Sequence, residues 1–292
     1  MLAILVVAGF LVRFTVADRF LRLSVLYYAL PWPVLAAFSG MLSWQTKLRW
    51  GRMAWLSAGV GAFASWIMHS WQWPPVSSEP AGLRIALWNV SRPGWRLDRV
   101  VRELRARDSD VIALSEALPR HQNSVQRWQE AFPEYQTAYF ERGDMLLLVR
   151  GTITGQKGGK LSPHSFYGGI HADVKGHAFG VVHVDLDASI GGDRSLPFPP
   201  LVDVLIDSFP DCMFVLGDFN TPRDSTHFDI LRHAGWQHTF EASGRGYADT
   251  WPMPLPVLSL DQIWTRLRPL RCTHGVTALS DHRPVFADVA WK

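Results

Sequence analysis

The sequence predicts a helical membrane segment followed by an α/β domain, in which mixed β-sheets pack face to face with helices outside. Three observations lead to this prediction. Long apolar runs are confined to about residues 1–72, whereas residues 83–292 have an ordinary globular composition. The second part alternates strand-like and helix-like apolar patterns. Its acidic and amide residues recur where the strand-like runs end.

The first part contains three apolar stretches, at about residues 1–17, 23–43 and 53–71. A helix needs about 20 residues to cross the hydrocarbon core of a membrane. The second and third stretches meet this length, whereas Arg13 interrupts the first, so we expect two to three transmembrane spans. Tryptophans cluster near the ends of the stretches, as expected at a membrane interface. The alternatives are a buried helical bundle of a soluble protein, or a cleaved signal peptide, which would explain only the first stretch.

The orientation of these spans depends on the charges between them. The loop at residues 44–52 carries three basic residues and no acidic residue, which favours the cytoplasmic side. The loop at residues 13–22 carries three basic residues as well, but also one acidic residue. We therefore expect the domain at residues 83–292 to lie outside the cytoplasm. A linker rich in Pro and Ser, residues 73–82, would separate it from the membrane segment.

The charge of the second part does not indicate a polyanion-binding protein. Of the 29 basic and 26 acidic residues, residues 1–82 hold six and two, which leaves 23 and 24 for the remainder. A protein that grips a nucleic-acid backbone usually shows a basic face, and net charge reveals none here, although a local patch is compatible with it. The two cysteines, Cys212 and Cys272, lie in strand-like runs and are interpreted as small buried side chains, with one disulfide as the alternative outside the cytoplasm.

The order of elements in the second part follows from its apolar periodicity. We expect strands at residues 83–90, 110–115, 135–140, 145–150, 168–174, 178–186, 212–218, 259–267 and 282–291, and helices at residues 95–107, 121–132, 200–208 and 225–233. Strand pairs mixed with helices are typical of an α/β architecture with mixed sheets.

Residues suited to phosphoester chemistry fall at the ends of these strands. They are Asn89, Glu116, Asp218, Asn220, Asp261, Asp281 and His282. Strand ends and the loops after them are where α/β folds place chemistry. Oxygen ligands of this kind suit a hard cation such as Mg²⁺ or Mn²⁺. A histidine beside one aspartate and oriented by another suits hydrolysis.

The motifs WNV, SEAL, LGDFNTP and SDHRPV occur in this order along residues 88–285. In this order they resemble the endonuclease/exonuclease/phosphatase superfamily, which includes deoxyribonucleases, apurinic endonucleases, neutral sphingomyelinases and inositol-polyphosphate phosphatases. The resemblance covers nearly all of residues 83–292 and implies a four-layered α/β sandwich with its site at one end of two sheets. The N-terminus resembles that of membrane-anchored bacterial members, which implies the bacterial cytoplasmic membrane.

The resemblance also implies roles on the metal side of such a site. Glu116 matches the family's metal-binding glutamate. Asn89 matches the asparagine that supports the metal or the phosphate. Asp281 matches a carboxylate near the metal.

The remaining matches concern the reaction itself. Asp218 matches the aspartate that positions and activates the attacking water, and Asn220 the asparagine that holds phosphate oxygens. His282 matches the histidine that contacts phosphate and stabilises the charge of the transition state. Asp261 matches the aspartate that fixes the ring of that histidine.

One position departs from the family pattern. Many members carry a second histidine in a strand reading Thr-His-Leu, where this sequence has Asp185, and His183 lies two residues earlier. An aspartate donates a proton only if its pKa is strongly raised. Asp185 is therefore interpreted as an additional metal ligand, or as a sign that the leaving group needs no acid, or as a sign that activity is weak or lost.

Two arginines are candidates for contact with the substrate phosphate: Arg194 and Arg223. The alternative for each is a solvated loop charge. Six other histidines are interpreted as structural or surface residues: His171, His183, His227, His233, His238 and His274.

The sequence thus predicts a membrane-tethered, metal-dependent hydrolase of a phosphodiester or phosphomonoester. The substrate is a nucleic acid, or a lipid or other small phosphoester, and the membrane segment shifts the weight modestly toward the latter. The alternative is a binding or scaffolding module that retains the fold without turnover. No protein partner is identifiable from the sequence.

Overall fold

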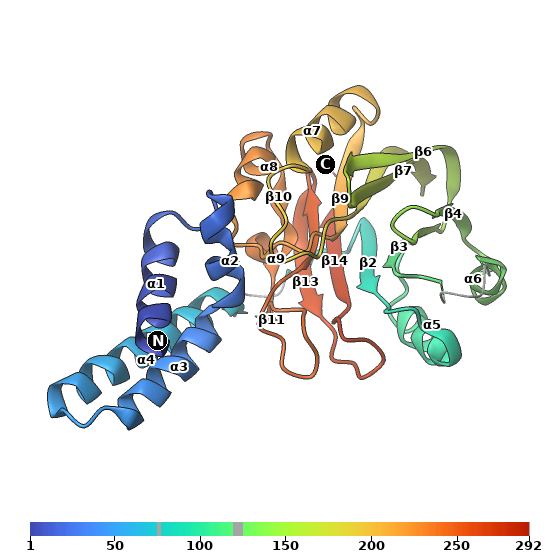
Figure 1. The fold of residues 1–292 in the computed structure, drawn as a ribbon. Coiled ribbons are helices and arrows are strands. Elements are labelled where there is room, and N and C mark those ends of the chain that lie inside the picture. The colour runs from blue at the N-terminus through green and yellow to red at the C-terminus, as the bar shows by residue number, and fades with distance from the viewer. Residues whose placement is uncertain (75–76, 119–124, 292) are drawn as a thin grey trace.

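In the computed structural model, which describes residues 1–74, 77–118 and 125–291, two six-stranded sheets pack face to face beside a separate group of helices (Figure 1). The first sheet has the order β13-β14-β2-β3-β5-β4, with β13 Arg268–His274, β14 Val285–Ala290, β2 Leu83–Asn89, β3 Val111–Ser115, β5 Met145–Val149 and β4 Gln136–Phe140. The second has the order β10-β12-β9-β8-β7-β6, with β10 Gln237–His238, β12 Asp261–Thr265, β9 Cys212–Asp218, β8 His177–Asp185, β7 Ser165–Val174 and β6 Thr152–Ser162.

Alternation of side chains along each strand gives every sheet an inner and an outer apolar face. In β2, Leu87 points into the core between the sheets, while Trp88 points to the outer face. Helices α5 Leu97–Arg105 and α6 Val125–Ala131 cover that outer face. Helices α7 Phe198–Asp207 and α8 Asp229–His233 cover the outer face of the second sheet. The prediction of two mixed sheets flanked by helices is confirmed.

Among the strands longer than two residues, β6 was not expected from the sequence, and β13 was indicated only by the strand-like run around Cys272. Strand β6 is rich in Gly and Lys and lies exposed at the edge of its sheet, so it lacks the apolar alternation that indicates a strand. Strand β13 carries two arginines and a proline and also forms a sheet edge. The expected helix at 121–132 begins at Val125 in the described part of the chain, and residues 121–124 lie outside it.

The N-terminal part, called here the helical region (residues 1–72), contains α1 Leu2–Thr15, α2 Leu21–Ala29, α3 Trp32–Gln45 and α4 Arg49–Ser70. Within the described residues, no single helix combines the length and the apolarity needed to cross a membrane. The stretch at residues 23–43 is divided into α2 and α3, which meet at 71° and pass that test only as a bent pair. The break coincides with Pro31 and Pro33, because proline is accommodated in the first turn of a helix but not in its interior.

The helical region is attached to the α/β domain through buried polar groups. Asp18, between α1 and α2, is 1% exposed and accepts hydrogen bonds from Ser225 Oγ, from Thr226 N at 3.0 Å and from Tyr28 Oη at 2.8 Å. At the end of α4, Trp66 Nε1 and Ser70 Oγ donate to one carboxylate oxygen of buried Asp249, at 3.1 and 2.9 Å.

The chain after α4 continues this attachment. Strand β1 Trp71–Gln72 pairs with β11 Gly246–Tyr247. The expected linker at residues 73–82 therefore begins directly after residues paired to the domain, and its residues 75–76 lie outside the described part.

Candidate active site

The topology brings the polar strand ends to one edge of the sandwich. Strands β2 and β3 run parallel, as do β8 and β9, so the carboxyl ends of each pair lie together. Strands β12 and β14 run antiparallel to their neighbours, so their beginnings lie at the same edge. Seven candidate residues from the sequence meet here, together with Asp185: Asn89, Glu116, Asp218, Asn220, Asp261, Asp281 and His282.

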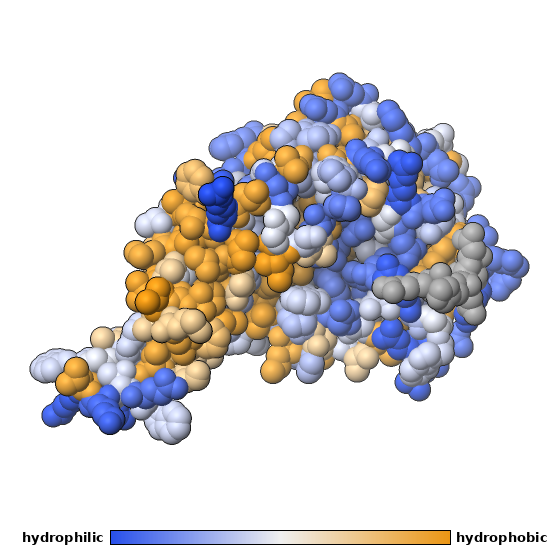
Figure 2. Space-filling model, in the orientation of Figure 1, coloured by the Kyte–Doolittle hydropathy of each residue, from blue (hydrophilic) through white to orange (hydrophobic). Residues whose placement is uncertain are grey.

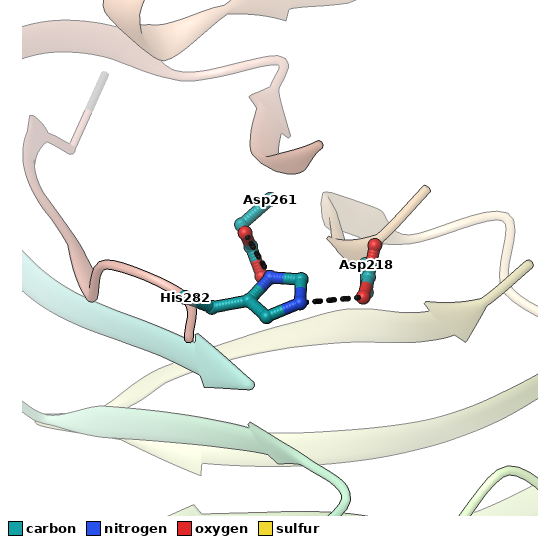
Figure 3. Close-up of side chains that lie close together, drawn as sticks. All are labelled: Asp218, Asp261 and His282. Atoms are coloured by element: carbon teal, nitrogen blue, oxygen red, sulfur yellow. Dashed lines mark hydrogen bonds and ion pairs between the residues drawn. The ribbon is translucent and has the colours of Figure 1, made fainter. Parts of the chain in front are cut away.

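His282 lies between two aspartates (Figure 3). Its Nδ1 lies 2.8 Å from Asp261 Oδ2, and its Nε2 lies 3.9 Å from Asp218 Oδ2. The backbone around the ring is also fixed, since Trp88 Nε1 donates to the His282 carbonyl at 3.0 Å. The bond to Asp261 orients the ring so that Nε2 faces the site.

These two carboxylates govern the protonation of His282. Burial alone lowers the pKa of a histidine, but the negative charges of Asp261 and Asp218 outweigh it and raise the pKa of His282 to about 10. The ring is therefore an imidazolium at neutral pH. Burial also raises the pKa of Asp218, against the opposing charge of His282.

Potential ligand atoms of Asp218, Asp261 and His282 lie within 4.8 Å of one another. We interpret these three residues as a proton-handling triad, because the bond to Asp261 occupies one ring nitrogen and directs the other toward Asp218.

Further carboxylates, those of Glu116 and Asp185, line the cavity beside the triad. Asn89 Nδ2 donates to both Glu116 Oε1 at 3.2 Å and Asp218 Oδ2 at 3.0 Å. Asp185 lies directly opposite Asp218 in the register of β8 and β9. Burial and the charges of Asp218 and Glu116 hold the pKa of Asp185 well above its usual value. Crowded, partly desolvated oxygen ligands of this kind fit Mg²⁺ or Mn²⁺.

Unusual backbone conformations occur at the same edge. Glu116 and Asn220 have φ of 51° and 48°, in the left-handed region that costs a non-glycine residue on the order of 1 kcal/mol or more. Gly217 has φ of 148°, and a Cβ there would lie 1.9 Å from the carbonyl oxygen of Val184. Only glycine allows β8 and β9 to approach so closely beside Asp218.

Two charged residues of the site, Arg92 and Asp144, were not among those predicted from the sequence. Arg92 forms an ion pair with Glu116, and its Nε lies 3.9 Å from Asp144 Oδ2. Burial raises the pKa of Asp144 to about 6. Arg92 follows Asn89 by three residues, and this proximity to a strand end was the available signal. Asp144 lies in a turn between two strands, and no sequence pattern distinguishes it.

A cavity of about 730 Å³ opens at this edge. Seven predicted site residues line it: Glu116, Asp185, Arg194, Asp218, Asn220, Asp281 and His282. Asn89 and Asp261 are buried behind it and contact lining residues. The six histidines interpreted as structural do not line it, whereas His164 does. Buried His183 instead contacts Ser115 Oγ through Nε2 at 2.9 Å.

The structure does not bring the two candidate arginines together. Arg194 lines the cavity. Arg223 lies outside its lining, with its guanidinium 5.6 Å from the ring centre of Phe240, beside a small separate hollow. Cys212 and Cys272 are buried free thiols.

Comparisons with known proteins agree with this arrangement. A family model described as Endonuclease/Exonuclease/phosphatase family matches residues 86–282. No curated protein sequence matches the chain. Similar solved structures include the mannosyl-6-phosphatase of Bacteroides thetaiotaomicron VPI-5482, with 16% identity, a TM-score of 0.61 and coverage of 72% of this chain and 100% of that one.

Two animal proteins have similar structures. The catalytic domain of human Nocturnin, with a bound sulfate anion, has 16% identity, a TM-score of 0.60 and coverage of 74% of this chain and 96% of that one. The humanized TDP2 of D. rerio has 16% identity, a TM-score of 0.57 and coverage of 72% and 99%. At such identities these similarities establish the fold. Each leaves more than a quarter of this chain unmatched.

Proposed function

Because the chain belongs to the endonuclease/exonuclease/phosphatase family, we propose that it is a divalent-metal-dependent hydrolase of phosphoesters that works at a membrane. The observation that carries the proposal is the pairing of a carboxylate cluster with an imidazolium held by Asp261, both facing one cavity. Members of this family are phosphoesterases, and the carboxylates of Glu116 and Asp185 are oxygen ligands of the kind that suits Mg²⁺ or Mn²⁺. When bound, such a cation would supply positive charge at the phosphoryl oxygens.

The side chains of the site have separate roles in the proposed reaction. Asp218 accepts the proton of the attacking water, since it lies between the carboxylate cluster and His282. His282 offsets the negative charge that develops on the phosphoryl group, because it is protonated and faces the cavity. Asp261 keeps the ring in that orientation, and Asn220 adds a polar contact at the rim. Asp185 completes the oxygen ligands of the cation.

The membrane part of the proposal rests on the surface of the helical region. Of the 26 exposed large hydrophobic side chains in the described residues, 19 lie in residues 1–72. Figure 2 shows this concentration of apolar surface on the helices, in contrast to the mainly polar surface of the α/β domain. A continuous apolar surface of this kind marks an interaction with a membrane or another apolar partner. Attachment to the bacterial cytoplasmic membrane, with the α/β domain outside the cytoplasm, stays a prediction.

The test is hydrolysis by the full chain in detergent with Mg²⁺ or Mn²⁺. Suitable substrates are p-nitrophenyl phosphate, bis(p-nitrophenyl) phosphate, plasmid DNA and phospholipid. We expect turnover of at least one class that is lost on chelation and falls by about a hundredfold or more in Glu116→Gln and in His282→Ala. The variant His233→Ala, altered on the exposed side of α8, should keep full activity. A folded chain that binds the metal but hydrolyses none of these substrates would instead favour a non-catalytic binding module.

A further inference from the structure

The helical region forms part of the wall of the active-site cavity. Tyr28 and Ala29 at the end of α2, Pro31 in the break, and Val34 in α3 line the cavity that also contains Glu116, Asp218 and His282. The similar solved structures and the family model leave a part of this chain unmatched that is about as long as the helical region. The cavity therefore combines the family's reaction site with a wall that the matched domain does not supply.

The lining of this cavity combines two kinds of chemistry. Its charged residues include the carboxylates, His282 and Arg194. Its apolar residues come from both parts of the chain: Ala29, Pro31, Val34, Ile190, Val257 and Leu258. A ligand that fills the cavity therefore presents a phosphate to the charged residues and an apolar group to the apolar ones.

The wall is held rigidly against the domain. Asp18 is buried and bonded to Ser225 and Thr226 of the domain and to Tyr28 of the helical region. Trp66 and Ser70 are bonded to Asp249 at the other end of the helical region. Because these contacts lie on both sides of α3, the apolar wall has a fixed position in the cavity.

Arg194 links the apolar wall to the charged residues of the cavity. It is 9% exposed, and its guanidinium lies 4.4 Å from the ring centre of Tyr28, so a residue of the helical region positions it. Its Nε is buried without a hydrogen-bond partner among the described residues, and its Nη2 reaches only the Ser189 carbonyl at 3.5 Å. A buried guanidinium with unsatisfied donors binds an anion favourably. Because Arg194 also lines the cavity, it places a positive charge next to the apolar wall, where a phosphate would be bound.

We infer that the helical region is the specificity element of the active site, and that the substrate is a lipid phosphoester whose phosphate contacts Arg194 and whose apolar chain lies against Val34, Pro31 and Leu258. The inference rests on the proposed function. Nucleic acid fits less well, because the apolar wall offers no charge to further phosphates along a strand. The exposed apolar faces of the same helices favour a membrane as the source of the lipid.

The first experiment uses the unaltered full chain in detergent. The lipid substrates are phosphatidic acid and phosphatidylglycerol with dibutanoyl and dioctanoyl chains, and the references are the two nitrophenyl esters and plasmid DNA. We expect kcat/KM for the lipids to rise at least about tenfold from the shorter to the longer chains. Equal values for both chain lengths, or faster turnover of DNA than of any lipid, would overturn the inference while leaving the proposed function intact. Absence of any metal-dependent turnover would refute the proposed function itself.

The second experiment changes the wall and the arginine separately. Val34→Asn should lower kcat/KM about tenfold for the dioctanoyl lipids and much less for p-nitrophenyl phosphate, which has no acyl chain. Its control is Val7→Asn on the exposed side of α1, which should affect neither substrate. Arg194→Leu should raise KM for every phosphoester and weaken inhibition by inorganic phosphate. An equal effect of Val34→Asn on lipid and nitrophenyl substrates would show that the wall has no part in specificity.

Discussion

The helical region and the α/β domain distribute polarity in opposite ways. The domain buries its apolar side chains between and outside its sheets and exposes few of them. The helical region buries only eight hydrophobic residues and exposes 19 large ones, while its buried Asp18 faces the domain. The helices are therefore attached to the domain through specific polar bonds as well as aromatic contacts with Tyr247, and their remaining apolar faces are free for another environment.

The largest effect should arise from a change confined to the domain. Asp261→Asn removes the charge that holds the His282 imidazolium, so kcat should fall about a thousandfold. KM should change little, because Asp261 does not line the cavity. Steady-state kinetics measures both. The matched control is Asp288→Asn. Asp288 lies on β14 and forms an ion pair with Arg271, and this variant should keep full activity. A large rise in KM with unchanged kcat would contradict the positioning role.

The counterpart in the helical region is Asp18→Ala. It leaves the donors of Ser225 and Thr226 without their acceptor and should weaken attachment of the helices by on the order of 3 kcal/mol. Limited proteolysis and urea unfolding in one detergent measure this loss. The matched control is Asp229→Ala, whose exposed ion pair with Arg232 lies within the domain and should contribute less than about 1 kcal/mol. Equal effects of both variants would show that the attachment is not specific to Asp18.

A smaller effect on activity is expected from a change at Asp185, the position where many family members have a histidine. Asp185→Asn should raise the Mg²⁺ concentration for half-maximal activity about tenfold, since it removes one carboxylate of the cluster. Metal titration of activity measures this shift, and Asp207→Asn on the exposed side of α7 is the control. If metal dependence stays the same and only substrates with poor leaving groups slow down, Asp185 instead donates a proton to the leaving group.

The smallest effect concerns pH. Burial opposes ionisation of Asp18, but bonds from Ser225 and Tyr28 and the charge of His227 together lower its pKa below the usual 3.8. A carboxylate with a lowered pKa stabilises the fold above about pH 3.8 and loses this contribution as the pH falls through its folded pKa. Attachment of the helices should therefore weaken below about pH 3.8 in the unaltered chain. Urea unfolding of Asp18→Asn should lack this part of the pH dependence, and an identical acid response in both chains would contradict it.

Much of the α/β fold was predictable because its strands are buried on both faces. Runs such as Leu83–Asn89 and Met145–Val149 are nearly continuous apolar sequence. The edge strands β6 and β13 were harder to predict from the sequence. One side of an edge strand faces solvent and tolerates Gly, Lys and Arg. In the helical region, composition indicated apolar helices. The division at Pro31 follows from the local constraint that proline places on a helix, whereas the polar attachment depends on tertiary contacts that no local pattern encodes.

The residues of the candidate site were likewise predictable from the sequence only in part. Strand-end residues such as Glu116 and Asp218 were predictable because parallel strands bring their ends together. Arg92 and Asp144 were missed, since their importance arises from proximity to Glu116 in space. The contribution of Tyr28 and Val34 to the cavity was equally inaccessible, because they lie in a segment interpreted only as membrane anchor.

The bond between Asp18 and Ser225 also has a consequence for the order of synthesis, because 207 residues separate the two. A ribosome needs about 10–40 s to add that many residues. During this interval the carboxylate that will attach the helices has none of its domain partners, although α1 to α4 have already emerged. Under the proposed membrane attachment, we expect the helical region to reach the membrane during this interval, and the finished domain to fold onto helices that are already in place.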